Sequence, residues 1–284
     1  MGDITLALGG GGSKGYAHLG VIQALEEQGF SIRAIAGTSA GGMAGAIYAA
    51  GHSPEVLLED IASLSQENLY GFGRGPALLD PKGIHSLLES YLGEIEFTDL
   101  QIPCALTAVD LKGMTEISIR EGSVLDGVKA TIAIPGVFPP VERGEYLLVD
   151  GMVLNPVPVE LARSLAPRLP VVAVSLSPEP ERWKAASPWD NRPANPLMRP
   201  ISRLRIAQAF DVYLRSMDMT THMLGEVRLM VEKPAVLIRP DVSHIGFLDR
   251  VDICEVAQLG AEAVHKNLRA LKKIKRRSGR KSRK

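Results

Sequence analysis

Short apolar runs alternate with longer segments of helical periodicity along most of the chain. Residues 5–8 and 32–36 are brief apolar runs that each end at a glycine-rich turn, and the segment between them has apolar side chains at the spacing of a helix. This order predicts a strand, a helix and a second strand. Such units are right-handed and parallel, so both glycine turns should leave the same edge of the sheet, which is where ligands bind in α/β folds.

The alternation continues to residue 271. Further strands are predicted at 103–109, 115–119, 146–149 and 235–238, and helices at 41–50, 53–64, 82–92, 123–134, 159–165, 201–227 and 251–271. The strands at 103–109 and 115–119 should form a hairpin at the edge of the sheet. Strands that alternate with helices predict a single α/β domain over residues 1–271, with a mostly parallel central sheet.

The second glycine-rich turn fits the nucleophile-elbow pattern G-x-S-x-G. Residues 37–41 read Gly-Thr-Ser-Ala-Gly and lie between a predicted strand and a predicted helix, which is the context that this pattern requires. Gly37 and Gly41 permit the sharp turn, and Ser39 should project its hydroxyl at the start of the helix. The alternative interpretation is a tight turn with a serine that caps the helix.

The first turn, residues 10–15, fits G-x-G-x-x-G, and two of its three interpretations lack a required residue. A dinucleotide site needs an acidic residue about 20 positions further on, where Ala36 and Gly37 stand instead. A phosphate-binding loop needs a hydroxyl residue directly after its lysine, and here Lys14 is followed by Gly15.

The third interpretation is an oxyanion hole, in which successive glycines leave backbone N–H groups pointing at one spot because no side chain intervenes. The donors would be Gly10, Gly11 and Gly12. This interpretation is the one that also gives Ser39 a role, because a serine nucleophile needs hydrogen-bond donors for the negative charge that develops on the substrate oxygen.

A serine hydroxyl is hardly ionised at neutral pH and needs a neighbouring base. Asp150, which with Gly151 follows the predicted strand 146–149, is one candidate, although an Asp-Gly pair by itself is most often a turn signal. His244 would complete the Ser-Asp-His order of the α/β-hydrolases, but that architecture places several strands before its serine, and Ser39 follows the second strand. A Ser39–Asp150 dyad is therefore preferred, with a Ser-Asp-His esterase as the alternative. The other five histidines are expected to be structural.

Composition narrows the class of protein further. The 284 residues carry 32 basic and 32 acidic side chains, so no overall electric field favours nucleic acid or acidic lipid. The two cysteines, Cys104 and Cys254, cannot form a disulfide framework, and neither has the spacing of a metal ligand. The N-terminus lacks the basic and apolar regions of a signal peptide, and we expect a cytoplasmic protein.

Two segments depart from the alternating pattern. Residues 177–200 are rich in proline and contain Trp183 and Trp189, so we hypothesise a flap that contacts lipid, with a mobile surface loop as the alternative. Residues 272–284 are almost wholly basic and lack an apolar face, which predicts a disordered tail that binds anionic lipid in preference to nucleic acid, with a purely solubilising tail as the alternative. Both segments predict peripheral contact with a membrane.

Together these residues resemble the patatin-like phospholipases, a family of serine–aspartate lipid acyl hydrolases with bacterial members. The likeness is carried by the glycine-rich residues 9–15, by residues 37–41 and by Asp150-Gly151, in that order along the chain. Residues 133–141 and, more weakly, 107–113 add to it. The ordered match covers about residues 4–176, and three motifs in sequence are far more specific than any one of them.

The resemblance implies a three-layer α/β/α fold and a phospholipid or lysophospholipid substrate. It implies that Ser39 is the nucleophile that forms an acyl-enzyme and Asp150 the base, with no metal or other cofactor. The family usually has glycine or alanine where Met152 stands, and a methionine there should narrow or reshape the site without removing the dyad. The alternative from another class is a non-catalytic protein that binds lipid or phosphate on the same fold.

Overall fold

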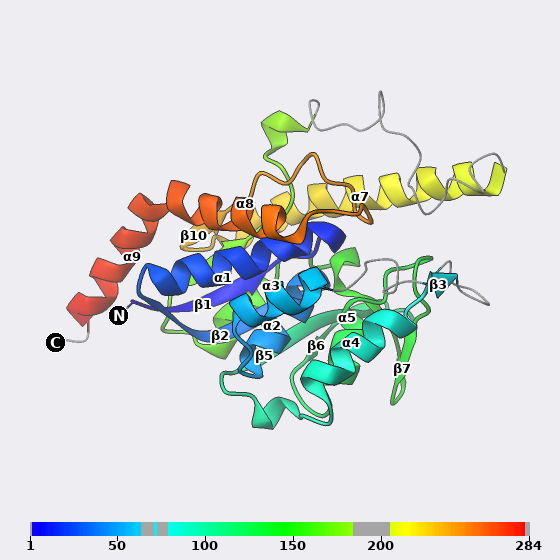
Figure 1. Cartoon of the computed structure of the whole chain (residues 1–284), viewed down its shortest axis with the longest axis horizontal. Helices are drawn as coiled ribbons and strands as arrows, with labels where there is room; N and C mark the ends of the chain where they lie inside the picture. Colours follow the sequence, from blue (N-terminus) through cyan, green and yellow to red (C-terminus); the bar gives the residue numbers. More distant parts are fainter. Residues whose placement is uncertain (1, 64–70, 73–78, 184–204, 282–284) are drawn as a thin grey trace.

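The computed structural model describes residues 2–63, 71–72, 79–183 and 205–281 of the chain. Within these residues eight strands form one central sheet (Figure 1): β1 (Gly2–Leu8), β2 (Phe30–Thr38), β5 (Cys104–Asp110), β6 (Thr115–Ile119), β7 (Val141–Arg143), β8 (Tyr146–Asp150), β9 (Val171–Val174) and β10 (Val236–Ile238). Two short strands, β3 (Gly71–Phe72) and β4 (Leu79–Asp80), pair with each other apart from it. The helices are α1 (Ala17–Glu27), α2 (Ala40–Ala49), α3 (Pro54–Ser63), α4 (Lys82–Leu92), α5 (Val124–Thr131), α6 (Val159–Leu165), α7 (Arg205–Glu232), α8 (Ile253–Lys266) and α9 (Leu268–Lys281).

The sheet is mixed, and its parallel part lies at the N-terminal strands. The strand order is β10-β9-β1-β2-β5-β8-β7, with β6 pairing with β5. The neighbours β10, β9, β1, β2 and β5 are parallel. By contrast, β6 and β8 run antiparallel to β5, and β7 runs antiparallel to β8. The predicted strand-helix-strand unit and the mostly parallel α/β sheet are confirmed, whereas β3, β4, β7 and β9 were not predicted. The predicted hairpin is formed by β5 and β6, but its predicted place at the edge of the sheet is wrong, because β5 lies between β2 and β8.

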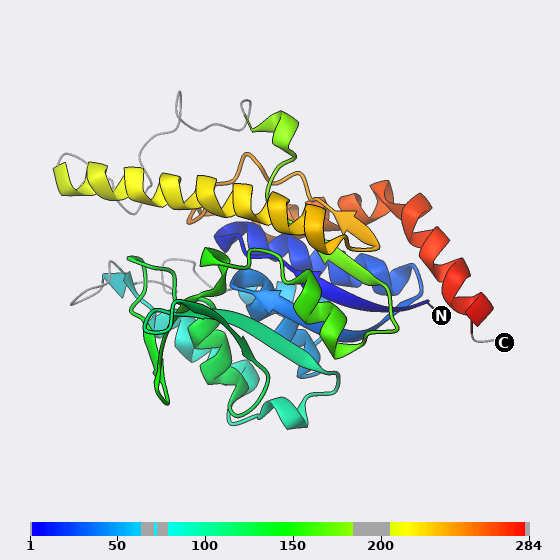
Figure 2. The ribbon, with the colours of Figure 1, turned by 180° about the vertical axis from the view of Figure 1, so that it is seen from behind.

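Helices cover both faces of the sheet, as the views from the two sides show (Figures 1 and 2). On one face, α1, α2, α4, α5 and α8 contribute to core clusters around large strand residues such as Leu6 and Leu106. On the other face, α6 and α7 pack against the small residues Ala7, Ala36 and Ala105. The three-layer arrangement is therefore confirmed, with the small side chains on the second face allowing α6 to approach the sheet closely.

The C-terminal ends of β2 and β8 meet along one edge of β5. Thr38 of β2 pairs with Thr107 of β5, and Asp150 of β8 pairs with the next residue, Ala108. β6 occupies the other edge of β5 at both positions, so Thr38 and Asp150 lie on the same edge. β2 runs parallel and β8 antiparallel to β5, so the two strands point at each other. This junction brings together two chain segments that are 111 positions apart.

The C-terminal region is more helical than the sequence predicts. The expected helix over 251–271 is divided at Asn267 into α8 and α9, and α9 continues to Lys281 although a disordered tail is predicted from residue 272. Leu271 and Ile274 lie one turn apart on α9 and are buried against the core cluster of β1 and α1. This pair supplies the apolar face that the composition alone does not reveal. Residues 282–284 lie outside the described part of the chain.

The segments that the sequence links to lipid are described only in part. The flap predicted over 177–200 is described as far as Trp183, whose Nε1–H donates to the carbonyl of Pro178 at 3.0 Å, and the remainder lies outside the described residues.

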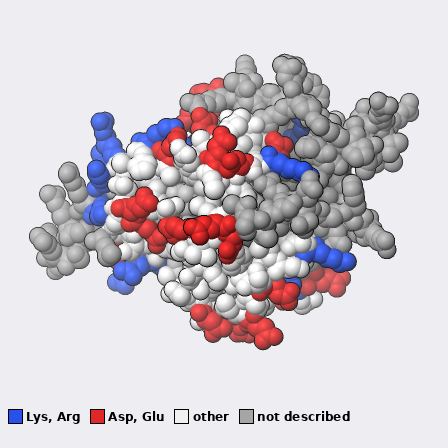
Figure 3. Space-filling model, viewed as in Figure 1, with Lys and Arg blue, Asp and Glu red and all other residues white. Residues whose placement is uncertain are grey.

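Figure 3 shows acidic side chains across the middle of the face that carries α1 and α8, and basic side chains at the end where α9 lies. Among the described helices, none combines the length and the apolarity needed to cross a membrane.

Candidate active site

Ser39 lies on a strained turn between β2 and α2. Its φ of 53° and ψ of −124° fall in a region that residues other than glycine rarely adopt, at a cost of about 1–3 kcal/mol. The backbone N–H of Ser39 donates to Oγ1 of Thr131 on α5 at 2.9 Å, which holds the turn in place. The turn has the strained strand-to-helix geometry that the G-x-S-x-G pattern of residues 37–41 predicts.

Asp150 ends β8 and accepts a hydrogen bond directly from the serine. The Ser39 Oγ hydroxyl donates to Asp150 Oδ2 at 2.5 Å, and the N–H of Met152 donates to Asp150 Oδ1 at 2.8 Å. The exposed fractions of Ser39 and Asp150 are 2% and 1%. The structure therefore brings together the two residues predicted to form the dyad, in a buried site with both carboxylate oxygens engaged.

Burial tunes the acidity of this carboxyl group. Loss of hydration raises the pKa of Asp150 from 3.8 to about 7, although the hydrogen bonds from Ser39 and Met152 act in the opposite direction. A carboxylate with a pKa near neutrality is a much stronger base than an exposed one, and it still ionises at physiological pH. The site can therefore take a proton from a hydroxyl group.

The glycine-rich loop follows β1 and passes beside Ser39, but its three predicted donors are not equivalent. The Gly10 N–H already donates to the carbonyl of Pro156 at 3.0 Å, so the prediction that it faces a substrate oxygen is corrected. Gly11 and Gly12 stand at the start of the 3-10 helix Gly12–Tyr16, where N–H groups have no partner within the helix. Within the described chain these two amides donate no hydrogen bond.

The four other glycines of the motifs are sites of close approach. A Cβ atom added to Gly15 would lie 2.5 Å from Ala40 Cβ, and one added to Gly37 would lie 2.4 Å from Gly42 Cα. A Cβ atom added to Gly41 would lie 2.3 Å from the Leu8 carbonyl oxygen, and one added to Gly151 would lie 2.1 Å from Thr107 Oγ1. Each packs the elbow, the loop or the aspartate turn against its neighbour, as their place in the motifs predicts.

Within the described residues, neither His244 nor His18 forms a hydrogen bond with Ser39 or Asp150. His244 is exposed in the loop after β10, and within the described residues no hydrogen bond joins it to Ser39 or Asp150. His18 is fully buried on α1, and burial lowers its pKa to about 4. The neutral ring therefore donates from Nε2 to the carbonyl oxygen of Gly9 at 2.7 Å, which supports the glycine-rich loop. A structural role for His18 agrees with the sequence prediction.

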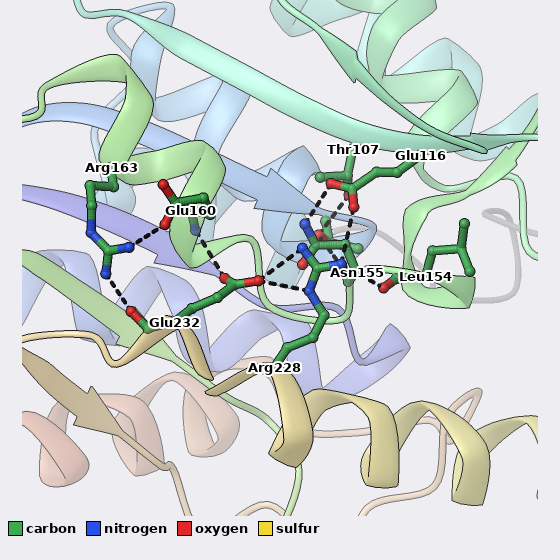
Figure 4. A network of polar contacts seen from close by, with 9 residues as sticks. Thr107, Glu116, Leu154, Asn155, Glu160, Arg163, Arg228 and Glu232 are labelled. Carbon is green, nitrogen blue, oxygen red and sulfur yellow. Dashed lines mark hydrogen bonds and ion pairs between the residues drawn. The ribbon is translucent and has the colours of Figure 1, made fainter. Parts of the chain in front are cut away.

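A polar network that the sequence does not signal supports Thr38, the residue before Ser39 (Figure 4). The Thr38 hydroxyl donates to the Asn155 carbonyl at 2.8 Å and accepts from the Thr107 hydroxyl at 2.7 Å. The Asn155 amide group donates to Glu116 Oε1 at 2.6 Å, and Arg228 of α7 donates to Glu116 Oε2 at 3.1 Å. One arginine thus connects α7 and β6 to the turns that carry both predicted catalytic residues.

Replacing Arg228 by methionine is expected to lower the free energy of unfolding by about 2 kcal/mol, because it removes the partner of two partly buried carboxylates, Glu116 and Glu232. Urea-induced unfolding followed by circular dichroism measures the change. The control is Arg33→Met, which removes an arginine from an exposed pair with Asp3 and should cost less than about 1 kcal/mol. Equal losses in the two variants would contradict a supporting role for the network.

Comparison with known proteins places the site in a family. The family model for patatin-like phospholipases matches residues 6–163. An uncharacterised NTE family protein of Mycobacterium tuberculosis is 36% identical over 184 residues, which is 61% of this chain and 49% of that protein. A second uncharacterised NTE family protein of M. tuberculosis is 30% identical over 283 residues, 94% of this chain and 47% of that protein. The chain thus spans about half the length of these relatives.

One further sequence match and one solved structure extend the comparison. Patatin-like phospholipase domain-containing protein 6 of Mus musculus is 28% identical over 233 residues, 71% of this chain and 17% of that protein. Among solved structures, VipD from Legionella pneumophila aligns with a TM-score of 0.55 at 12% identity over 95% of this chain and 67% of its own. At this identity, the structural likeness bears on the fold alone.

Proposed function

The chain belongs to the patatin-like phospholipase family, and we propose that it is a serine hydrolase that cleaves fatty acyl esters of phospholipids or lysophospholipids. The observation that carries the proposal is the hydrogen bond of 2.5 Å from Ser39 Oγ to Asp150 Oδ2, in a site where both side chains are buried. Burial makes the carboxylate basic enough to activate the hydroxyl, which an exposed aspartate would do poorly.

In the proposed mechanism, Ser39 Oγ attacks the ester carbonyl carbon while Asp150 Oδ2 takes the hydroxyl proton. The negative charge that develops on the carbonyl oxygen is stabilised by the N–H groups of Gly11 and Gly12, and such a donor is typically worth about 3 kcal/mol of barrier. Asp150 then returns the proton to the leaving alcohol, which departs as the acyl-enzyme forms. Asp150 then takes a proton from a water molecule as this water attacks the acyl carbon. The bond from the acyl carbon to Ser39 Oγ breaks, Asp150 returns the proton to Ser39 Oγ, and the fatty acid is released.

Contact with a membrane is part of this proposal, since the substrate is a lipid. The basic end of the molecule at α9, where Lys272 and Lys273 are exposed, supports attraction to anionic lipid head groups. The hypothesis that residues 177–200 dock on lipid falls mostly outside the described residues and stays a prediction.

Ser39→Ala is expected to abolish labelling by a fluorophosphonate probe and to remove hydrolysis of a panel of phospholipids, lysophospholipids and short esters, because the variant lacks the hydroxyl oxygen that attacks the ester carbonyl carbon. The matched control is Ser31→Ala, at the opposite end of the same strand, which should label like the wild type. Intact-protein mass spectrometry after labelling measures the effect.

The outcomes separate the competing functions. Equal labelling of wild type and Ser39→Ala would refute the proposal. Phospholipid binding without turnover by the wild type would favour a non-catalytic lipid-binding protein. A conventional triad requires that His244→Ala lose activity, whereas the dyad leaves that variant active, because His244 is exposed and makes no described contact with the pair.

A further inference from the structure

Met152 occupies the space between the predicted dyad and an adjoining pocket. A Cβ atom built on Gly10 would lie 2.3 Å from Met152 Cγ, 2.4 Å from Met152 Sδ and 3.1 Å from Ser39 Cβ. The methionine side chain and the serine therefore meet on the same side of Gly10. Only a glycine at position 10 leaves room for both.

The pocket on the outer side of Met152 has mixed chemistry. It lies between the glycine-rich loop, the residues that follow β9 and the inner face of α7, and Met152, Gly10, Leu176 and His222 are among its lining residues. Neither Ser39 nor Asp150 lines it, and both are almost completely buried. In this conformation neither side chain of the predicted dyad is presented to the pocket.

The backbone and the side chain of Met152 have different freedom. Its N–H is fixed by the hydrogen bond to Asp150 Oδ1 at 2.8 Å, in the 3-10 turn Gly151–Val153. The side chain is unbranched and has three rotatable bonds, which makes methionine the apolar residue most easily moved at low cost. The part that can open a path to Ser39 is therefore the side chain, while the turn that holds the base stays in place.

We propose that the Met152 side chain is the specificity-determining element of the site: it separates the pocket from Ser39 and, when rotated aside, sets the width of the passage through which the acyl group reaches the serine. This inference rests on the proposed hydrolase function. A narrow passage admits an unbranched acyl chain and rejects one that is branched next to the carbonyl carbon. The expected substrates are therefore esters of linear fatty acids.

The test is a pair of p-nitrophenyl esters, butyrate and pivalate, assayed with wild type, Met152→Ala and Met152→Leu. Met152→Ala should raise the ratio of kcat/KM for pivalate to kcat/KM for butyrate by about tenfold. The smaller side chain leaves space for the branched acyl group, and room for one methylene group typically changes kcat/KM by about tenfold or more. Comparing one ratio across variants cancels the intrinsic reactivity of each ester. The alanine variant keeps the backbone N–H that holds Asp150, so the base is retained.

Met152→Leu is the matched control, because leucine has the same number of heavy atoms as methionine and should keep the ratio within about twofold of wild type. Met152→Val removes less volume than the alanine variant and should give an intermediate ratio, which keeps the test decisive if Met152→Ala does not fold. The ratio must respond to the volume of the side chain and not merely to the loss of the thioether.

The results distinguish failure of this inference from failure of the proposed function. If the variants hydrolyse butyrate in a Ser39-dependent way and the ratio does not change, the role of Met152 is overturned and the hydrolase proposal stands. If no variant shows Ser39-dependent turnover or fluorophosphonate labelling, the hydrolase proposal fails, and the inference fails with it.

Discussion

Replacing Asp150 by asparagine is expected to lower kcat/KM for ester hydrolysis about a thousandfold, because a general base contributes about 10²–10⁴-fold and an amide cannot take the proton from Ser39. The amide oxygen can still accept from the Met152 N–H, and the amide NH2 group can donate to Ser39 Oγ, so the local fold should persist. Steady-state kinetics on a short ester, with circular dichroism to verify the fold, measures the loss. Unchanged turnover would contradict the assignment of Asp150 as the base.

The pH profile gives an independent readout of the same group. Since the ionised carboxylate is the form that accepts the proton and its pKa is raised to about 7, kcat/KM of the wild type should rise with pH below 7 and level off above it. A flat profile between about pH 5 and 8 would show that the base has an ordinary aspartate pKa of about 4.

Stability should change in the opposite sense to activity. The folded-state pKa of Asp150 lies above its unfolded value of 3.8, so the folded protein favours the protonated form. The contribution of Asp150 to stability is complete below about pH 4 and is lost as pH rises through about 7. Above that range Asp150→Asn should therefore be more stable than the wild type, by an amount on the order of 4 kcal/mol.

Asp110 on β5 serves as a control of opposite sign. The N–H groups of Leu147 and Gly113 donate to its carboxylate and hold the pKa of Asp110 below its usual value. The ionised form therefore favours the fold above the unfolded pKa, and Asp110→Asn should be less stable than the wild type at neutral pH. Equal responses of the two variants to pH would show that burial of Asp150 does not govern its titration.

Replacing Gly41 by alanine is expected to lower the free energy of unfolding by about 3 kcal/mol or more, because the new Cβ cannot be placed without moving backbone. It would lie 2.3 Å from the Leu8 carbonyl oxygen and 2.6 Å from the Gly9 carbonyl oxygen. The clash pushes the start of α2 away from the glycine-rich loop, so hydrolysis should be lost as well. Urea-induced unfolding and the ester assay measure the two effects.

Gly225→Ala on α7 is the matched control. Its new Cβ would meet nothing closer than Pro156 Cβ at 3.5 Å, an ordinary contact. Because alanine is favoured over glycine inside a helix, this variant should be more stable than the wild type by about 0.5–1 kcal/mol. If Gly41→Ala unfolds at the same urea concentration as Gly225→Ala, the close approach at the elbow does not constrain the fold.

Several features that matter for the site could not be predicted from the sequence, because they depend on contacts between distant segments. The Gly10 N–H donates a hydrogen bond to the carbonyl of Pro156, a contact that no local sequence pattern reveals. Arg228 is one of many charged residues on a long helix, and its connection to Thr38 passes through two other elements. Ile274 is buried because α9 packs against the core cluster next to α1, and the basic sequence around it does not indicate this contact.

The sequence by itself determined the local units: the first strand-helix-strand, the strained turn at Ser39, the glycines at points of close approach and the turn that follows Asp150. The first strand-helix-strand and the two turns follow from short-range backbone geometry, which glycine and periodicity encode directly. The motifs marked the glycines, whereas the segments that approach most of them come from distant parts of the chain. Only the tertiary structure decided that β5 joins the ends of β2 and β8, so that the serine and the aspartate touch, and that burial there brings the pKa of Asp150 to about 7. Strand pairing and desolvation arise from the packing of segments far apart in the chain, and no local pattern carries that information.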